Sequence, residues 1–528
     1  MQEAIDKLTA WAEDWCVMIN KEKSSTTLFT LSSKQKAGTV RMGDTPMTEA
    51  DETTYLGVTF DKRQTWKPHL MKAEGRARRK LAMMRKLAGT TWGANEHILK
   101  TVYQGTVRPQ LEYSSPTWSS TAKSNRQALD KIQNQALRIM TGATKSTPIA
   151  FMEKITGIQP LQERRDVKIL LQTEKYKCLT DHPMSARVKG YTKNRIKRSS
   201  FVHEAKKLDK AYATDLTIPT TPLGQEDIID PLQNDLSNVA VRSSVPHLQP
   251  GKQEDEHIRK SLTLAMIDDE YPREAWTYVY TDGSATRAVI NGGAGIVILY
   301  PSGKRETHHA ATGTHCSNYR AETLALMKAV SMIEDSTEDV NSIVFFTDAM
   351  SVLEALTNNK VPQLANALQR ISTNLNVTLQ WIPAHCGVAG NEDADQLAKQ
   401  GAQLDQPPVQ VSYKEKVTII KSLTRPRQEA DAYHLLSRAE QVIMVRLRSG
   451  HNRLNAHMHK KYRLAPSPTC PCGTEDQTAE HILQRCKRHD QERATKWPQD
   501  TTLHQKLYGD VDDLRRTTSF IEETGVIV

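Results

Sequence analysis

The chain has 528 residues, too many for a single compact core, so about three or four domains are expected. Its 71 Lys and Arg exceed its 61 Asp and Glu, and the formal net charge of +10 favours a polyanionic partner. The seven Cys residues lack the spacing of a disulfide framework, and the longest apolar run, 294–300, is too short to span a bilayer. We therefore expect an intracellular protein without a membrane partner, in either the nucleus or the cytoplasm.

The first 165 residues divide by composition. Residues 1–60 combine helical periodicity with short strand-like runs, and residues 61–165 are helical and basic. Twelve Lys and Arg residues lie at 61–108 against only three acidic residues. This bias favours nucleic-acid binding over an ordinary solvated surface.

Aromatic residues in the basic region allow two roles. Trp66, Trp92 and Tyr103 lie among the cations, which fits stacking against the bases of a nucleic acid. The alternative is packing in a helical core, and we favour it for Trp92 and Trp118.

The rest of the chain alternates between ordered and polar segments. Residues 166–273 lose periodicity and are punctuated by Pro, which predicts a linker with partial helices. Residues 274–404 contain strand signals at 277–281, 295–300, 308–314, 342–346 and 376–381, the last two alternating with helices. This order predicts an α/β domain with a mixed five-stranded sheet and flanking helices. A basic helical region (405–464), a Cys/His region (465–490) and a C-terminal tail (491–528) follow.

Four acidic residues stand where predicted strands end or helices begin. Asp282 lies in Tyr-Thr-Asp-Gly-Ser, Glu322 in Asn-Tyr-Arg-Ala-Glu and Asp348 in Phe-Phe-Thr-Asp. Asp395 lies in Gly-Asn-Glu-Asp-Ala-Asp-Gln-Leu-Ala, where Asp393 is its rival. Each acid alone fits a cap or turn, but four together predict a site for two Mg²⁺ ions about 3.5–4 Å apart.

These strings resemble the type-1 ribonuclease H family over nearly all of residues 275–402. The resemblance implies an endonuclease that cuts the RNA strand of RNA–DNA hybrids with two Mg²⁺ or Mn²⁺ ions held by the four carboxylates. His385, in Trp-Ile-Pro-Ala-His-Cys-Gly, is similar to the family's loop histidine and can exchange protons near neutral pH, unless it is an ordinary loop residue. The resemblance also implies substrate contacts from Ser284, Asn318 and Arg320.

Two features differ from the family pattern. Ala349 follows Asp348 where the family usually has a small hydroxyl side chain. The stretch between Leu356 and Asn376 is short and poorly charged, which resembles retroelement versions of the domain. Such a domain is expected to grip its hybrid weakly and to need help from elsewhere in the chain.

The N-terminal region carries a second resemblance. The strings at 19–24, 55–58 and 107–118, with Gln-Asn-Gln-Ala-Leu-Arg at 133–138, together resemble a non-LTR retrotransposon reverse transcriptase. Residues 1–60 would be a palm remnant and residues 61–165 a thumb-like domain. The polymerase site of that family includes a Tyr-x-Asp-Asp turn, and residues 1–60 contain none. We therefore expect a 5′-truncated polyprotein fragment that makes no DNA by itself.

A Cys/His cluster lies near the C-terminus. Cys470, Cys472, His481 and Cys486 offer three thiols and one imidazole, a set suited to tetrahedral Zn²⁺, although the first spacing is tight and unligated thiols are the alternative. The cluster resembles the zinc knuckle that follows the ribonuclease H domain in such retroelements. Its role would be structural, with nucleic-acid contacts from Arg485 and its neighbours.

Two functions from different classes follow. The first is an RNA–DNA hybrid endonuclease, favoured by the four acids and His385. The second is a catalytically inactive nucleic-acid-binding remnant, kept open by the missing polymerase turn and the polar linker. Protein partners and oligomeric state stay undetermined by the sequence.

Overall fold

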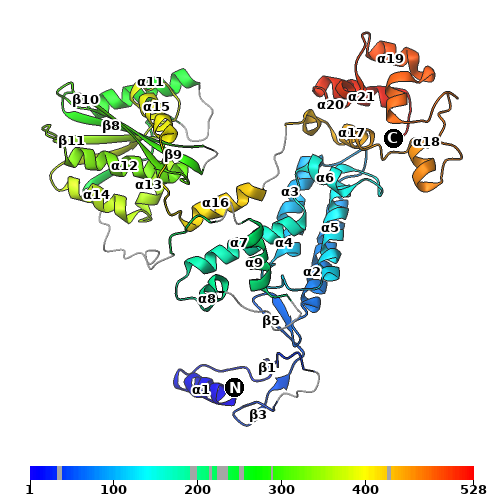
Figure 1. The fold of residues 1–528 in the computed structure, drawn as a ribbon, viewed down its shortest axis with the longest axis horizontal. Coiled ribbons are helices and arrows are strands. Elements are labelled where there is room, and N and C mark those ends of the chain that lie inside the picture. The colour runs from blue at the N-terminus through cyan, green and yellow to red at the C-terminus, as the bar shows by residue number, and fades with distance from the viewer. Residues whose placement is uncertain are drawn as a thin grey trace. The chain divides into compact units, whose positions relative to one another are not determined.

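A computed structural model describes residues 1–32, 38–190, 199–212, 217–222, 236–248, 255–286, 289–424 and 430–528 (Figure 1). The chain forms two compact units. The first comprises Met1–Ile169, Asn194–Ala205 and Thr424–Val528, and the second comprises Leu170–Lys193 and Lys206–Leu423. Across the described parts of the chain, every helix falls short of the length and apolarity that crossing a bilayer requires.

A six-stranded mixed sheet, in the order β10-β9-β8-β11-β12-β7, forms the centre of the second unit. Strand β9 runs antiparallel to both β10 and β8, whereas β8, β11, β12 and β7 are mutually parallel. The bounds are β7 Val239–Arg242, β8 Trp276–Thr286, β9 Ile290–Leu299, β10 Arg305–Gly313, β11 Ser342–Thr347 and β12 Asn376–Trp381. The unit's helices are α8 Pro183–Lys189, α11 Glu256–Glu270, α12 Asn318–Glu334, α13 Met350–Thr357, α14 Pro362–Ser372, α15 Ala389–Gln403 and α16 Tyr413–Thr424.

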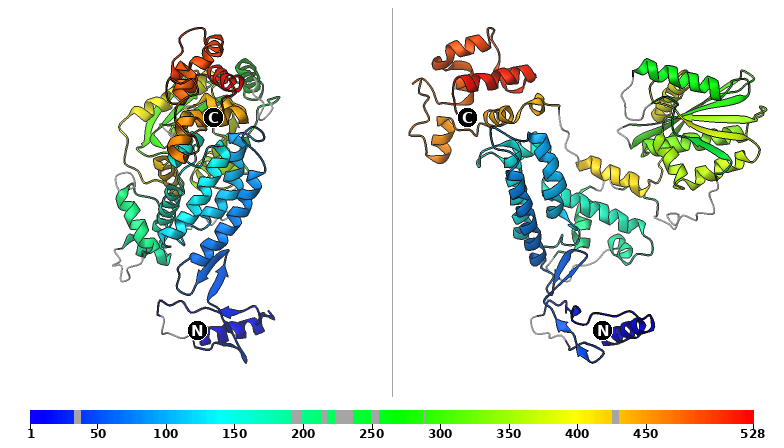
Figure 2. Two further views of the ribbon diagram at one scale, coloured as in Figure 1. Left: turned by 90° about the vertical axis from the view of Figure 1, so that its right-hand side faces the viewer. Right: turned by 180° about the vertical axis from the view of Figure 1, so that it is seen from behind.

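Helices cover both faces of this sheet (Figures 1 and 2). Because side chains alternate along a strand, Val279 and Phe345 point into one apolar layer with α12, α13 and α14. Tyr280 and Phe346 point into the opposite layer with α11 and α15, where their rings stack with centroids 4.9 Å apart. Burial on both faces explains why β11 reads as a continuous apolar run.

The sheet has one strand more than the five predicted. The additional strand, β7, lies within the predicted linker 166–273 and pairs in parallel with β12, Val239 opposite Val377. Its four residues are an edge strand with only Val239 buried, too short to show a period in a Pro-rich stretch. Helix α11 also lies in that segment, where partial helices were expected, so the linker prediction missed only the strand.

Glycines in β9 let α15 approach the sheet closely. A Cβ atom on Gly295 would lie 2.0 Å from the carbonyl oxygen of Ala394, and one on Gly293 would lie 2.0 Å from that of Ala398. Both oxygens are helix backbone, which cannot rotate away. This close approach places α15 directly on β9 and on its neighbours β8 and β10.

The first unit joins the basic helical region to the C-terminal part of the chain. Arg438 donates hydrogen bonds to the backbone carbonyls of Gly89 and Ile139, and Arg446 donates one to that of Gly142. Its helices are α1 Gln2–Asp14, α2 Lys67–Arg85, α3 Glu96–Val102, α4 Arg108–Glu112, α5 Lys123–Thr141, α6 Ile149–Thr156, α17 Arg438–Ser449, α18 Asn455–His457, α19 Asp490–Lys496, α20 Leu503–Tyr508 and α21 Val511–Glu523; α7 Leu161–Cys178 and α9 Phe201–Ala211 span the boundary between the units. Short strands precede α2, namely β1 Ser25–Thr26, β2 Arg41–Met42, β3 Thr45–Pro46, β4 Thr48–Glu49, β5 Glu52–Tyr55 and β6 Val58–Asp61.

The aromatic residues of the basic region separate by burial. Trp118, Trp66 and Tyr103 are buried in the helical core, which confirms core packing for Trp118 and leaves Trp66 and Tyr103 without a surface for base stacking. Trp92 is 59% exposed, so the favoured core role for this residue is wrong. Trp92 lies in the turn after α2. Helical periodicity does not extend to this turn, so it does not indicate whether the Trp92 side chain faces the core.

Candidate active site

Three of the predicted carboxylates meet in one place. Asp282 lies in β8, Glu322 in the first two turns of α12, and Asp348 directly after β11. One oxygen from each lies within 4.8 Å of the others. The parallel pairing of β8 with β11 brings Asp282 and Asp348 together at one end of the sheet.

Gly283 determines how closely Glu322 can approach Asp282. A Cβ atom on Gly283 would lie 2.2 Å from the backbone nitrogen of Glu322 and 2.6 Å from the carbonyl carbon of Ala321. Helix α12 therefore contacts β8 directly through backbone atoms. At its start, the Ser317 hydroxyl accepts a hydrogen bond from the Arg320 N–H and caps the helix.

Burial and mutual repulsion favour the neutral forms of these acids. Burial, followed by the charges of Asp348 and Asp395, raises the pKa of Asp282 to about 7. Burial, followed by the charge of Asp282, raises the pKa of Glu322 as well, against the hydrogen bond from the Gly283 backbone. Burial also raises the pKa of Asp348, while a hydrogen bond from the Asn391 side chain and the nearby His385 lower it. In the described structure, Oε2 of Glu322 is buried without a hydrogen-bond partner.

The fourth predicted acid belongs to a second, adjacent group. One ligand atom each from Asp395, His385 and Glu392 lies within 4.8 Å of the other two. The charge of Asp395 acts on all three acids of the first group, so the two groups share one electrostatic environment. Asp395 also forms an ion pair with Lys399 one turn along α15.

Asp393, the alternative to Asp395 in the sequence analysis, lies away from both groups of acids. It forms a 2.6 Å ion pair with Arg305 at the start of β10 and lies outside both groups. Both Asp393 and Asp395 lie on α15, but positions two residues apart face opposite sides of a helix.

Glu392 is a site residue that the sequence interpretation did not single out. Its carboxylate accepts a 3.2 Å hydrogen bond from the backbone N–H of Gly387, and so holds the loop that carries His385. His385 is exposed and has a left-handed backbone with φ of 47°. A signal was available in Gly-Asn-Glu-Asp-Ala-Asp, because Glu392 precedes Asp395 by three residues and therefore shares its helix face.

The three residues predicted to contact the substrate lie in different surroundings. Ser284 follows Gly283 in β8 and is partly exposed, and Asn318 is exposed at the start of α12. Arg320 donates a 2.8 Å hydrogen bond to the carbonyl of Gln410 and lies 3.6 Å from Glu415. These contacts hold Arg320 against the segment that leads into α16.

The Cys/His cluster forms a compact set in the first unit. Ligand atoms of Cys470, Cys472, His481 and Cys486 lie within 4.8 Å of one another, with 3.7 Å between the Cys470 and Cys486 sulfurs. Nδ1 of His481 lies 3.5 Å from the carboxylate of Glu475. Arg485 forms ion pairs with acidic neighbours, which reduces the charge that it can offer a nucleic acid.

Comparison with known proteins agrees with this architecture. Residues 274–403 match the family described as RNase H. Two probable RNA-directed DNA polymerases from Drosophila melanogaster are similar over 142 residues: that of transposon BS is 28% identical and that of transposon X-element 27%. Each alignment covers 27% of this chain and only 16% of the relative.

Solved structures give further matches. RNase H1 from Halobacterium salinarum is 21% identical, with coverage of 24% of this chain and 96% of that chain and a TM-score of 0.21. LC11-RNase H1 in complex with an RNA/DNA hybrid is 18% identical, with coverage of 24% and 97% and a TM-score of 0.20. By the family match alone, residues 274–403 form an RNase H domain, in a chain that is similar over part of its length to RNA-directed DNA polymerases of transposons.

Proposed function

We propose that the RNase H domain hydrolyses the RNA strand of RNA–DNA hybrids, with two Mg²⁺ or Mn²⁺ ions held by Asp282, Glu322, Asp348 and Asp395. The observation that carries this proposal is the meeting of three carboxylates within 4.8 Å, with Asp395 adjacent. Acids this close repel one another. A divalent cation bound between them would offset this repulsion and stabilise the folded site.

The donor set fits a hard divalent cation. All four groups offer carboxylate oxygens, the ligands that Mg²⁺ prefers, and the unpartnered Oε2 of Glu322 leaves a buried acceptor to be satisfied. Two such ions, when bound, supply positive charge to the attacking and leaving oxygens of a phosphodiester.

The chain's own residues would orient the site and move protons. The Asn391 side chain would lower the pKa of the Asp348 carboxylate and favour its charged form, and the indole N–H of Trp381 donates to the Asp348 backbone carbonyl at 3.2 Å. His385, exposed on a loop held by Glu392, would carry a proton on its imidazole between solvent and the departing product.

A cleavage assay tests this function. The purified chain, incubated with Mg²⁺ and an RNA–DNA hybrid labelled on the RNA strand, is expected to shorten that strand and to leave duplex DNA of the same sequence intact. EDTA should stop the reaction. Binding of the hybrid without cleavage in either Mg²⁺ or Mn²⁺ would instead support the inactive remnant.

The Cys/His cluster would hold one structural Zn²⁺. Three sulfurs and one imidazole match the preferred tetrahedral ligand set, and Glu475 beside His481 resembles the carboxylate that commonly orients a zinc-bound histidine. The cluster adjoins the apolar core that contains Met444, Trp497 and Phe520, so the metal would stabilise the C-terminal part of the first unit.

Metal analysis of Cys486→Ser tests the zinc site. Wild type is expected to retain about one zinc per chain after dialysis, because four ligands close a structural site. Cys486→Ser should lose the zinc and unfold at a lower temperature. Cys178→Ser removes another buried thiol outside the cluster and should keep the metal. Equal zinc content in the two variants would reject the assignment.

A further inference from the structure

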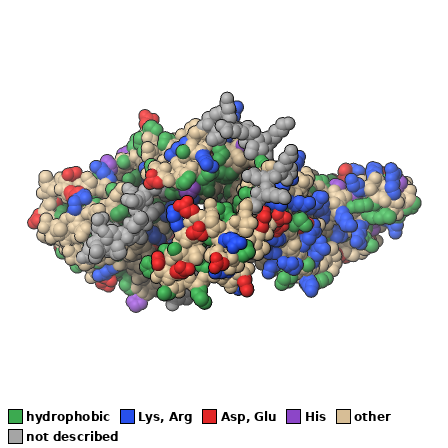
Figure 3. All heavy atoms as spheres, turned by 90° about the horizontal axis from the view of Figure 1, so that it is seen from below, with side chains coloured by type: hydrophobic (Ala, Val, Ile, Leu, Met, Phe, Trp, Pro, Cys, Tyr) green, Lys and Arg blue, Asp and Glu red, His purple; other side chains and the backbone are tan. Residues whose placement is uncertain are grey.

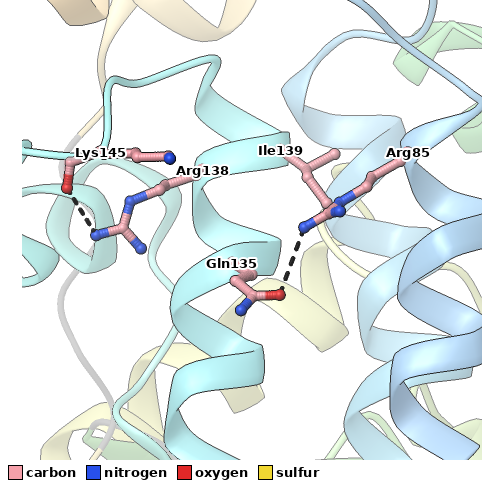
Figure 4. Close-up of a pocket in the computed structure, with 5 residues that line it drawn as sticks. All are labelled: Arg85, Gln135, Arg138, Ile139 and Lys145. Carbon is pink, nitrogen blue, oxygen red and sulfur yellow. Dashed lines mark hydrogen bonds between the residues drawn. The ribbon is translucent and has the colours of Figure 1, made fainter.

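A cavity of about 450 Å³ lies between α2 and α5 in the first unit, apart from the RNase H domain. It is lined by Arg85, Gln135, Arg138, Ile139 and Lys145 (Figure 4). Arg85 donates a 3.4 Å hydrogen bond to the Gln135 side chain, and Arg138 donates a 3.1 Å hydrogen bond to the backbone carbonyl of Lys145. Three cationic side chains thus surround one space.

This positive charge lacks acidic neighbours in the chain. No Asp or Glu occurs at 75–95 or at 131–152, the two segments that supply the cavity lining. Among the described residues, none of Arg85, Arg138 and Lys145 forms an ion pair, and Nε of Arg138 is buried without a hydrogen-bond partner. Cations without acidic neighbours attract anions. Figure 3 shows Lys and Arg side chains gathered on one face of the molecule, in line with the net charge of +10.

Stabilisation of the ends of α2 and α5 does not by itself explain why Arg85, Arg138 and Lys145 lie together. Arg85 and Arg138 lie in the last turns of α2 and α5, where positive side chains favour a helix. However, Arg438 and Arg446 already donate to the carbonyls that end α5, and Lys145 lies beyond that helix. The cluster therefore holds more positive charge than the helix ends require.

Trp92 lies in a turn that Arg438 ties to the cavity residue Ile139. Its indole lies over the backbone of Gly89, where a Cβ atom would be 2.4 Å from the indole nitrogen, yet 59% of the residue is exposed. Arg438 bridges the carbonyls of Gly89 and Ile139, so the turn that carries Trp92 lies beside the cavity wall. The indole therefore contacts Gly89 while more than half of the residue remains accessible to solvent.

We propose that Trp92, Arg85, Arg138 and Lys145 form a binding site for single-stranded nucleic acid, separate from the hybrid-cleaving site. The cations would take backbone phosphates, and an unpaired base would stack on Trp92. A duplex or hybrid keeps its bases paired and stacked, so it could use the cations but not the ring. A single strand is the ligand that satisfies both parts of the site.

Binding of a fluorescent oligodeoxythymidylate to the full chain, measured by anisotropy at several salt concentrations, separates the two contributions. Trp92→Ala should weaken binding by between about 5-fold and about 100-fold and leave the salt dependence unchanged. Arg85→Glu and Lys145→Glu should weaken binding and reduce the slope of log Kd against log salt by about 0.7 for each lost phosphate contact. Trp92→Phe keeps an aromatic face and should recover most of the affinity.

Lys123→Glu is the matched control. Lys123 begins α5, about 22 Å along the helix from Arg138, and the substitution makes the same change of charge. It should therefore bind the single strand like wild type. The proposal fails if Trp92→Ala binds as tightly as wild type, if Lys123→Glu is as weak as Lys145→Glu, or if duplex DNA loses as much affinity from Trp92→Ala as the single strand.

Discussion

Asp282→Asn is expected to lower the rate of hybrid cleavage by at least about 1000-fold, because a metal site contributes several kcal/mol of transition-state stabilisation and each 1.4 kcal/mol is tenfold in rate. Asn keeps the shape of the side chain but removes the charge that would hold a cation between Glu322 and Asp348. The measurement is the initial rate of RNA-strand cleavage at saturating Mg²⁺.

The same substitution is expected to stabilise the metal-free protein at about pH 8. The pKa of Asp282 in the folded protein, about 7, lies above its ordinary value of 3.8. The stability linked to this raised pKa is present below the ordinary value and is lost as the pH rises through about 7. Asp282→Asn in EDTA should therefore melt at a higher temperature than wild type near pH 8, and this difference should shrink as the pH falls towards 4. Added Mg²⁺ should stabilise wild type more than the variant.

Asp393→Asn is the matched control for this change. Asp393 lies on the same helix as Asp395 but pairs with Arg305, outside both groups of potential metal ligands. It should keep most of the cleavage activity and should not gain stability in EDTA. Equal cleavage by wild type and Asp282→Asn would exclude the assigned mechanism, and inactivity of both Asp variants would point to damage of α15 or β8 instead.

Gly283→Ala is expected to reduce cleavage by at least about 100-fold without altering any acid. The added methyl group would lie 2.2 Å from the Glu322 nitrogen, so α12 must move by about 1 Å or more, and displacements of that size cost about 100-fold in rate. The overpacking should also lower the free energy of unfolding by about 1–3 kcal/mol. Cleavage rates and thermal unfolding of the purified variant provide the two measurements.

Gly75→Ala controls for the Gly-to-Ala change itself. Gly75 lies inside α2, and no atom lies within 4 Å of the place that an added methyl group would occupy. Ala should therefore be tolerated there and should stabilise the helix by about 0.5–1 kcal/mol. If Gly283→Ala cleaves at the rate of Gly75→Ala, the direct backbone contact between β8 and α12 does not set the position of Glu322.

Local sequence signals predicted the elements that carry the acids. The strand before Asp348 is a continuous apolar run because both faces of the sheet are covered, and the strand before Asp282 is rich in aromatic and β-branched residues. Both patterns are visible in the sequence. Once parallel pairing is assumed, strand ends with Asp residues must lie at the same edge of the sheet. The pairing of Asp282 with Asp348 follows from those two facts, whereas the approach of Glu322 depends on the backbone contact between Gly283 and α12.

Features that depend on long-range contacts were not predictable in the same way. Strand β7 has four residues and gains its place only by pairing with β12, more than a hundred residues away. The loop contact of Glu392 depends on the backbone of Gly387, which no side-chain pattern reports. Likewise, Trp92 lies in a turn whose Gly89 carbonyl accepts a hydrogen bond from Arg438, 349 residues away in the chain. A local pattern does not report that contact.

The contact between Arg438 and Met140 joins residues 298 positions apart, and it has a consequence for the order in which the protein forms during translation. A ribosome that adds about 5–20 residues per second needs about 15–60 s to make the intervening chain. The helices α2 and α5 leave the ribosome first but must wait for their C-terminal partner, whereas the RNase H domain is complete before that partner appears. During translation the RNase H domain is thus complete while the basic helices, whose apolar core lies within residues 58–161, still lack the hydrogen bonds that Arg438 donates to them.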